Sequence, residues 1–236
     1  MTIDELYQKL QTRKIPAGRQ ETAKMDQMIR FLLEWNQKMN LTAIEDPEEA
    51  YEKHLLDCLL PLAYRIPQGT VCDVGSGAGF PGLVWAIVLP DVSFTLLEPR
   101  EKRCAFLRAA VNELELPNTQ VVCGRAEEFA KTERESFDCV TARAVANLSV
   151  LSELCLPLVK VGGVFAALKG PKGNEEYDEA AFAVRTLGGA PAEIISDTLP
   201  SEGQRTIVYI EKTKPTPPKY PRSYAKIKQK PLMEKH

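Results

Sequence analysis

Histidines and long apolar runs are scarce in this chain of 236 residues, and paired cysteines that could bind a metal are missing. There are two histidines, and one of them, His236, is the last residue. The six cysteines form no C-x-x-C pair and mostly lie inside apolar runs. We therefore expect reduced thiols in the core, and neither a zinc site nor any other metal centre.

No apolar run approaches the roughly 20 residues that a membrane span needs. Residues 1–10 form a polar, amphipathic segment and do not resemble a signal peptide. These two absences predict a cytoplasmic protein without a membrane partner.

The net charge of −2 excludes a strongly basic protein, but the charge is unevenly distributed. Residues 212–236 contain eight lysines and arginines against one acidic residue, Glu234. Such a local excess favours an anionic partner that meets one face of the molecule. Tyr220 and Tyr224 lie among these cations, which suits phosphate contact with base stacking, although a solubilising basic end has the same composition.

The first 66 residues have a helical pattern. In residues 25–35, apolar side chains recur at steps of three and four and form one face. The acidic segment at residues 46–49 suits the start of a further helix, which places His54 and Asp57 one turn apart. We favour a structural pair at the helix surface for these two residues over a hydrogen bond at a functional site.

After residue 67, apolar strands alternate with helices, which predicts a parallel α/β sheet. The expected strands cover residues 70–73, 92–97, 120–123, 137–142 and 163–168, with two more near 192–196 and 206–211. A short connection joins the last two, so we expect them to pair antiparallel and to complete a seven-stranded, mostly parallel sheet. The chain would form one compact domain with an N-terminal helical extension (1–66), an α/β core (67–213) and a basic C-terminal tail (214–236).

The most informative stretch is the turn after the first of these strands. The strand ends at Asp73, and four glycines follow within residues 75–82. Glycine lets the backbone adopt positive φ and approach a ligand closely, and Pro81 suits the first turn of a following helix. Such a turn leaves backbone N–H groups pointing at whatever binds there.

Two cofactors suit this turn. Gly77, Gly79 and Gly82 fit the G-x-G-x-x-G pattern of dinucleotide binding, with Glu98 about 20 residues further on to hold a ribose. The acid Asp73 resembles instead the first motif of Rossmann-like S-adenosylmethionine methyltransferases. A carboxylate there suits a cationic methionine end better than it suits a pyrophosphate.

The dinucleotide reading leaves a NAD-dependent oxidoreductase open. Tyr177 has Ala181 and not lysine four residues later, so it supplies no Tyr-x-x-x-Lys pair for hydride transfer. A glycine-rich turn that only packs a helix on a sheet is a third interpretation.

Ligands of a parallel sheet bind at the carboxyl ends of its strands. The polar side chains at these ends are Asp73, Glu98, Glu127, Arg143 and Lys169. One site can gather all five, and we expect the function there.

With these residues in place, the sequence resembles the ribosomal RNA small-subunit methyltransferase G family, also called glucose-inhibited division protein B. The resemblance covers nearly the whole chain, and Phe80-Pro81-Gly82 and Arg143-Ala144 are far more specific than the glycines. The other matching segments include Trp35-Asn36, Asn40-Leu41-Thr42, His54 with Asp57, Lys102-Arg103, Arg125-Ala126-Glu127, Leu168-Lys169-Gly170, Pro221-Arg222 and Lys230-Pro231-Leu232.

This resemblance implies a Rossmann-like class I methyltransferase that transfers a methyl group from S-adenosylmethionine to N7 of one guanine in 16S rRNA. The partner would be 16S rRNA or the 30S ribosomal subunit, and we expect a monomer. Arg125 and Arg205 would lie near the target and clamp the RNA backbone or guanine O6. The implied cofactor contacts, with Glu98 at the ribose, are Asp73, Gly75, Gly77, Gly79, Phe80, Glu98, Ala126, Glu127 and Arg143.

Methylation at guanine N7 demands little of the side chains. Because N7 carries an in-plane lone pair and no proton, positioning does most of the work, and no general base or covalent nucleophile is needed. The sequence fits, since it has no Pro-Cys pair like that of cytosine-C5 enzymes and no Asn-Pro-Pro-Tyr motif like that of exocyclic-amine methylases. A ribosome-associated binding protein with a silent pocket stays an alternative.

Overall fold

The computed structural model describes residues 1–143 and 145–234, so Ala144 of the Arg143-Ala144 motif and the last two residues of the basic tail lie outside the described residues. Its centre is a seven-stranded sheet in the order β3-β2-β1-β4-β5-β7-β6. The strands are β1 (Thr70–Val74), β2 (Ser93–Glu98), β3 (Thr119–Cys123), β4 (Phe137–Arg143), β5 (Val159–Lys169), β6 (Glu193–Leu199) and β7 (Gly203–Glu211). Strands β1 to β5 pair in parallel, and β7 runs antiparallel to both β5 and β6. The predicted, mostly parallel sheet is confirmed.

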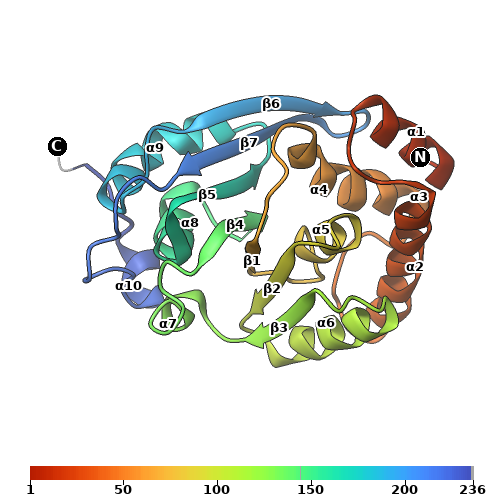
Figure 1. Ribbon diagram of the computed structural model, residues 1–236, viewed down its shortest axis with the longest axis horizontal. Coiled ribbons are helices and arrows are strands. Elements are labelled where there is room, and N and C mark those ends of the chain that lie inside the picture. Colours follow the sequence, from red (N-terminus) through yellow and green to blue (C-terminus); the bar gives the residue numbers. More distant parts are fainter. Residues whose placement is uncertain (144, 235–236) are drawn as a thin grey trace.

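Helices cover both faces of this sheet (Figure 1). The helices α5 (Gly82–Val88) and α6 (Glu101–Glu113) lie with the N-terminal helices on one face, and α8 (Leu148–Cys155), α9 (Gly173–Thr186) and α10 (Tyr224–Gln229) lie on the other. The strand order reverses between β1 and β4. In open α/β sheets, ligands bind at the carboxyl ends of the strands beside such a reversal.

The N-terminal extension is helical, as predicted, but its third helix is irregular. After α1 (Ile3–Thr12) and α2 (Arg19–Asn36), α3 (Pro47–Ala50) begins where the Asp46 side chain accepts the Glu49 N–H at 3.0 Å. The chain then continues as a π-helical turn (Tyr51–Leu56), α4 (Asp57–Leu59) and a 3₁₀ turn (Leu60–Ala63). Turns of π-helix are frequent at functional sites, and this one contains His54. No helix within the described ranges has the length and apolar character that crossing a membrane requires.

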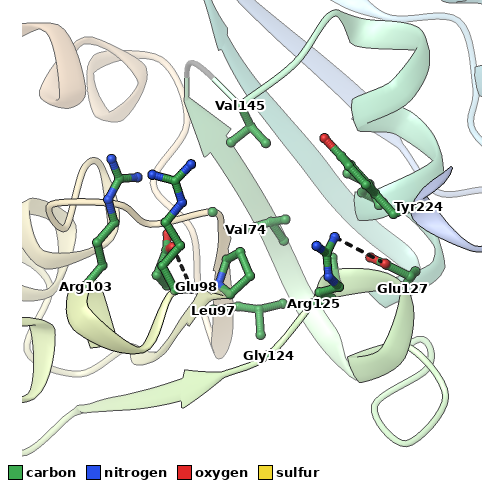
Figure 2. Close-up of a pocket in the computed structure, with 14 residues that line it drawn as sticks. Val74, Leu97, Glu98, Arg103, Gly124, Arg125, Glu127, Val145 and Tyr224 are labelled. Carbon is green, nitrogen blue, oxygen red and sulfur yellow. Dashed lines mark hydrogen bonds and ion pairs between the residues drawn. The ribbon is translucent and has the colours of Figure 1, made fainter. Parts of the chain in front are cut away.

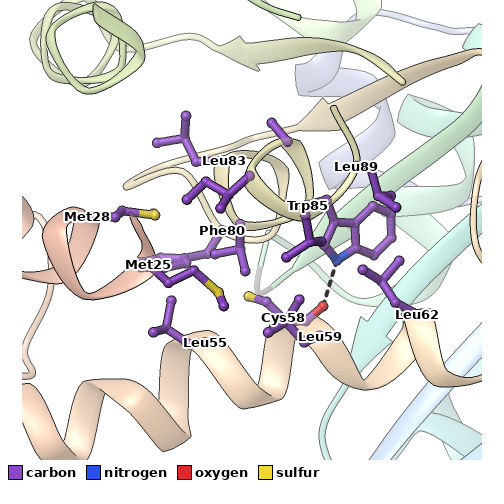
Figure 3. Close-up of a cluster of buried hydrophobic side chains, with 14 of the residues drawn as sticks. Met25, Met28, Leu55, Cys58, Leu59, Leu62, Phe80, Leu83, Trp85 and Leu89 are labelled. Carbon is purple, nitrogen blue, oxygen red and sulfur yellow. Dashed lines mark hydrogen bonds between the residues drawn. The ribbon is translucent and has the colours of Figure 1, made fainter. Parts of the chain in front are cut away.

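The hydrophobic core joins the N-terminal helices to α5 (Figure 3). Three of its fully buried side chains are Met25 of α2, Leu55 of the π-helical turn and Leu83 of α5. The Trp85 indole N–H donates to the Cys58 carbonyl at 2.6 Å. Burying one large apolar side chain contributes about 1.5–3 kcal/mol, so this contact fastens the extension to the sheet. The boundary proposed at residues 66 and 67 stays a prediction, and a single hydrophobic core runs across it.

The C-terminal tail is docked against α8 and the loop at Arg134 and is not a free basic arm. The Arg134 guanidinium donates to the carbonyls of Thr216, Pro217 and Tyr220, and the Ile227 side chain of α10 is fully buried. Tyr220 is 8% exposed and belongs to the core, which removes it as a platform for an RNA base. Its burial corrects our expectation that both tail tyrosines face a partner.

Candidate cofactor and acceptor cavities

Asp73 binds the backbone of the glycine-rich turn. Its side chain at the end of β1 is fully buried, Oδ2 accepts the Gly82 N–H at 2.9 Å, and Oδ1 has no hydrogen-bond partner among the described residues. Burial raises the pKa of this carboxyl to about 7. The structure therefore places Asp73 under the turn and outside the cavity in which we expected it to meet the methionine end.

The glycines adopt the backbone conformation expected of them, and one of them is also needed for close packing. Gly75, Gly77 and Gly79 have φ of +74°, +59° and +91°. A Cβ on Gly75 would lie 2.7 Å from a methyl carbon of Val145. The turn after β1 thus packs directly against the chain that follows β4, on the other side of the strand-order reversal.

Glu98 ties the turn after β1 to the turn after β2. Its Oε2 accepts the Gly77 N–H and its Oε1 accepts the Arg100 N–H, both at 3.0 Å. The side chain is nearly buried, yet it lines the adjacent cavity. Because each carboxylate oxygen has a second lone pair, Glu98 can still accept ribose hydroxyls.

A cavity of about 530 Å³ opens at the carboxyl ends of β1, β2 and β3. Figure 2 shows Arg103 and Tyr224 on opposite sides of it, with Val74, Leu97 and Gly124 between them. Among the expected cofactor residues, those that line it are Gly75, Glu98, Ala126 and Glu127. Those that do not line it are Asp73, Gly77, Gly79, Phe80 and Arg143.

Two side chains line this cavity that we did not expect at the cofactor. Arg125, implied as an RNA clamp, is exposed at its edge, with its guanidinium 5.2 Å from the Tyr224 ring centre and 3.8 Å from Glu127 Oε1. Tyr224, assigned to the tail, is a wall of the cavity. No local pattern could have revealed this, because Tyr224 reaches the cavity only through the docking of α10.

A second cavity of about 710 Å³ adjoins the first, and Val145 borders both. Its lining includes His54, Asp57, Arg143, Lys169 and Arg205. Arg125 and Arg205, which we both expected near the target, therefore line different cavities. The reason is topological, since Arg125 follows β3 at one edge of the sheet and Arg205 lies on β7 towards the other.

Asp57 holds both arginines of this second cavity. Its Oδ2 lies 2.8 Å from Arg143 Nη1, and its Oδ1 lies 3.0 Å from Arg205 Nε. Arg143 was implied as a cofactor contact, but it lines the second cavity and not the first. The carboxylate thereby joins β4 to β7 across the intervening strand β5.

His54 is a neutral side chain that contacts Arg143. Its ring stacks on Phe80 with 4.4 Å between centroids, and Arg143 Nη2 donates to its Nδ1 at 3.2 Å. Burial and the Arg143 charge lower the pKa of His54 to about 4. Both His54 and Asp57 contact Arg143 and line the cavity, which corrects our preference for a structural pair at the helix surface.

Comparison with known proteins decides the family. Residues 21–207 match the family described as rRNA small subunit methyltransferase G. The chain belongs to this family. A relative named ribosomal RNA small subunit methyltransferase G, from Staphylococcus aureus strain Newman, is 44% identical over 240 aligned residues that span all of both chains.

Solved structures of other methyltransferases share the fold of this methyltransferase G family member. An S-adenosylmethionine-dependent methyltransferase from Aquifex aeolicus has a TM-score of 0.52 at 17% identity, covering 72% of this chain and 96% of that one. A precorrin-6y C5,15-methyltransferase from Geobacter metallireducens has a TM-score of 0.51 at 14% identity, covering 74% and 91%. The expected Rossmann-like class I fold is thus confirmed.

The family assignment disfavours the dinucleotide interpretation of the glycine turn. Tyr224 and Lys228 of α10 do have the Tyr-x-x-x-Lys spacing that our sequence analysis did not note. This pair lies on the docked tail of a methyltransferase G family member, where the spacing alone is no evidence of hydride transfer.

Proposed function

We propose that this protein transfers the methyl group of S-adenosylmethionine to N7 of one guanine in 16S rRNA. The proposal rests on the full-length match to a relative named ribosomal RNA small subunit methyltransferase G. The two adjoining cavities support it, because a transferase must hold a donor and an acceptor within reach of each other. Val145 marks the border at which they meet.

The first cavity suits the donor. Its volume of about 530 Å³ lies within the usual range for small-molecule sites. Glu98 and Glu127 supply acceptors for ribose and adenine groups, and their charge suits a ligand that is cationic overall. Bound there, S-adenosylmethionine supplies an electrophilic methyl group. The backbone of the turn at Gly75 and the Tyr224 ring enclose the space.

The second cavity suits a guanine that acquires positive charge. Arg143 and Arg205 would oppose that charge if they were free, but Asp57 neutralises part of theirs, and Glu202 lies 3.3 Å from Arg205 Nη2. The same guanidiniums can position guanine O6 or a phosphate. His54 stays neutral, so the cavity holds no protonated imidazole beside the acceptor.

The experiment is incubation with tritiated S-adenosylmethionine and 30S subunits that lack the modification, followed by nucleoside analysis. We expect label in 7-methylguanosine, and none when fully modified subunits serve as control. No label from a protein that binds both the cofactor and 30S subunits would contradict the proposed acceptor and favour a silent ribosome-binding protein. Label in a different nucleoside would replace N7 of guanine as the target atom.

A further inference from the structure

Two guanidinium groups stand out because no acidic side chain among the described residues pairs with them. Within residues 1–143 and 145–234, every arginine other than Arg100 and Arg103 has a guanidinium in an ion pair or hydrogen bond. Arg100 and Arg103 flank the first turn of α6, so their like charges repel each other. Both line the mouth of the first cavity, and Figure 2 shows Arg103 on the side opposite Tyr224.

The same two arginines form one wall of a shallow groove of about 420 Å³ that lies between the end of α2 and the start of α6. Lys38 and Lys102 also line this groove, and neither has an ion pair in the described part of the chain. Its one acidic residue, Glu101, is bound by Arg108 at 3.0 Å. The groove therefore has four cations, Lys38, Arg100, Lys102 and Arg103, which we call the α6 rim.

We propose that the α6 rim binds the phosphodiester backbone of the RNA substrate, next to the nucleotide that enters the active site. This inference rests on the proposed function, and it names a second docking surface besides the tail. Guanidinium forks bind phosphate through two parallel hydrogen bonds, and solvent-exposed cations in a row are the usual footprint of a nucleic-acid site.

The cofactor is a weaker explanation for these cations. S-adenosylmethionine carries one carboxylate but two positive groups, so its net charge is +1, and extra cations at the mouth oppose its entry. Only two of the four rim residues line the cofactor cavity, whereas all four line the groove beyond it. A polyanion that passes over the mouth accounts for all four.

The tail offers a useful contrast. Two cations at the C-terminal end already have protein partners, since Arg222 of the tail binds the buried Glu153 of α8 at 2.6 Å and Lys212, just before the tail, lies 3.2 Å from Glu135. These contacts fasten the tail to the rest of the fold. The guanidiniums of the α6 rim have no comparable task in the fold, so removing them should change binding without unfolding the protein.

The test compares the double variant Arg100→Ala/Arg103→Ala with Arg30→Ala, which removes an exposed, ion-paired arginine outside the groove. Binding of a 16S rRNA transcript is measured from about 50 to about 200 mM salt, the range over which phosphate contacts are lost. We expect the double variant to bind about tenfold or more weakly, because bonds to charged groups are worth about 1.5–3 kcal/mol each. The slope of log K against log salt should shrink by about 1.4 for single-stranded or about 1.8 for duplex contacts.

Lys38→Glu provides an independent variant from a different element, and it should weaken RNA binding in the same way. Calorimetry with S-adenosylmethionine should show no loss of cofactor affinity in Lys38→Glu, because Lys38 does not line the cofactor cavity. An unchanged salt slope in the double variant, or an equal change in Arg30→Ala, would overturn the inference. So would lost cofactor affinity with intact RNA binding, which would assign the arginines to the cofactor carboxylate.

These outcomes are separable from the proposed reaction. If the wild-type protein makes no 7-methylguanosine but the double variant still loses RNA affinity and salt slope, the reaction is wrong and the α6 rim stands. If the wild-type protein methylates guanine and the double variant binds RNA normally, the rim is wrong and the reaction stands.

Discussion

Asp57 Oδ2 lies 2.8 Å from Arg143 Nη1, a contact that links the helical extension to the end of β4. The other oxygen of the same carboxylate holds Arg205 on β7. One side chain of the N-terminal extension thus contacts both guanidiniums of the second cavity. The extension also shares a hydrophobic core with the sheet, which fixes Asp57 relative to the two strands.

We expect Asp57→Asn to lower both stability and turnover. All three side chains are largely buried, and removing one partner from buried ion pairs costs about 3–5 kcal/mol. Methyl transfer at saturating cofactor should fall more than cofactor affinity does. The measurements are urea unfolding and steady-state kinetics. Asp4→Asn, which breaks only the exposed pair with Arg19, should cost less than about 1 kcal/mol, and an equal loss there would contradict this role of Asp57.

Gly75→Ala should abolish cofactor binding or weaken it strongly. The residue has φ of +74°, and its new Cβ would lie 2.7 Å from Val145, so the turn or the chain after β4 must move. Calorimetric titration with S-adenosylmethionine is the measurement. Gly170→Ala is the matched control, because its Cβ meets no atom within 4 Å and its φ is not positive. Normal cofactor affinity in Gly75→Ala would show that the turn tolerates this displacement.

Glu98→Ala should weaken cofactor binding by about tenfold or more. The change removes the acceptor for two backbone N–H groups and the predicted ribose ligand together, and each hydrogen bond to a charged group is worth about 1.5–3 kcal/mol. Glu128→Ala, at an exposed residue that pairs with Lys131, should bind as the wild type does. If Glu98→Ala binds S-adenosylmethionine as tightly as the wild type, the ribose assignment is wrong.

The raised pKa of Asp73 predicts a specific dependence of stability on pH. Its folded value of about 7 exceeds the ordinary value of 3.8, so the folded state holds more protons in between, and stability is lost as pH rises from about 4 to about 7. Relative to Asp73→Asn, the wild-type free energy of unfolding should therefore fall across this window. Urea unfolding at several pH values measures it, and a flat difference would contradict the raised pKa.

The lowered pKa of His54 predicts the opposite dependence of stability on pH, over much of the same pH range. Its folded pKa of about 4 lies below the ordinary 6.5, so the unfolded state binds more protons and stability rises with pH between these values. Relative to His54→Gln, the wild-type free energy of unfolding should rise from about pH 4 to about pH 6.5. The two differences must have opposite signs, which a general effect of pH on the fold would not produce.

The sequence by itself determined the strands, the order of α and β elements and the family of this protein. Continuous apolar runs that alternate with helical segments predict strands, because burial on both faces of a parallel sheet requires such runs. The glycines near Asp73 predict the tight turn, because positive φ strains any residue with a Cβ. These are local demands, and a local pattern is sufficient to recognise them.

Only the tertiary structure decided how the site is divided. Asp57 and Arg205 are 148 residues apart, and no spacing rule predicts that they touch. The same holds for Tyr224 at the cofactor cavity and for the unpaired Arg100 and Arg103, because whether a charge finds a partner depends on what packs beside it. Contacts between distant segments arise from the packing of whole elements, which periodicity and motif spacing do not encode.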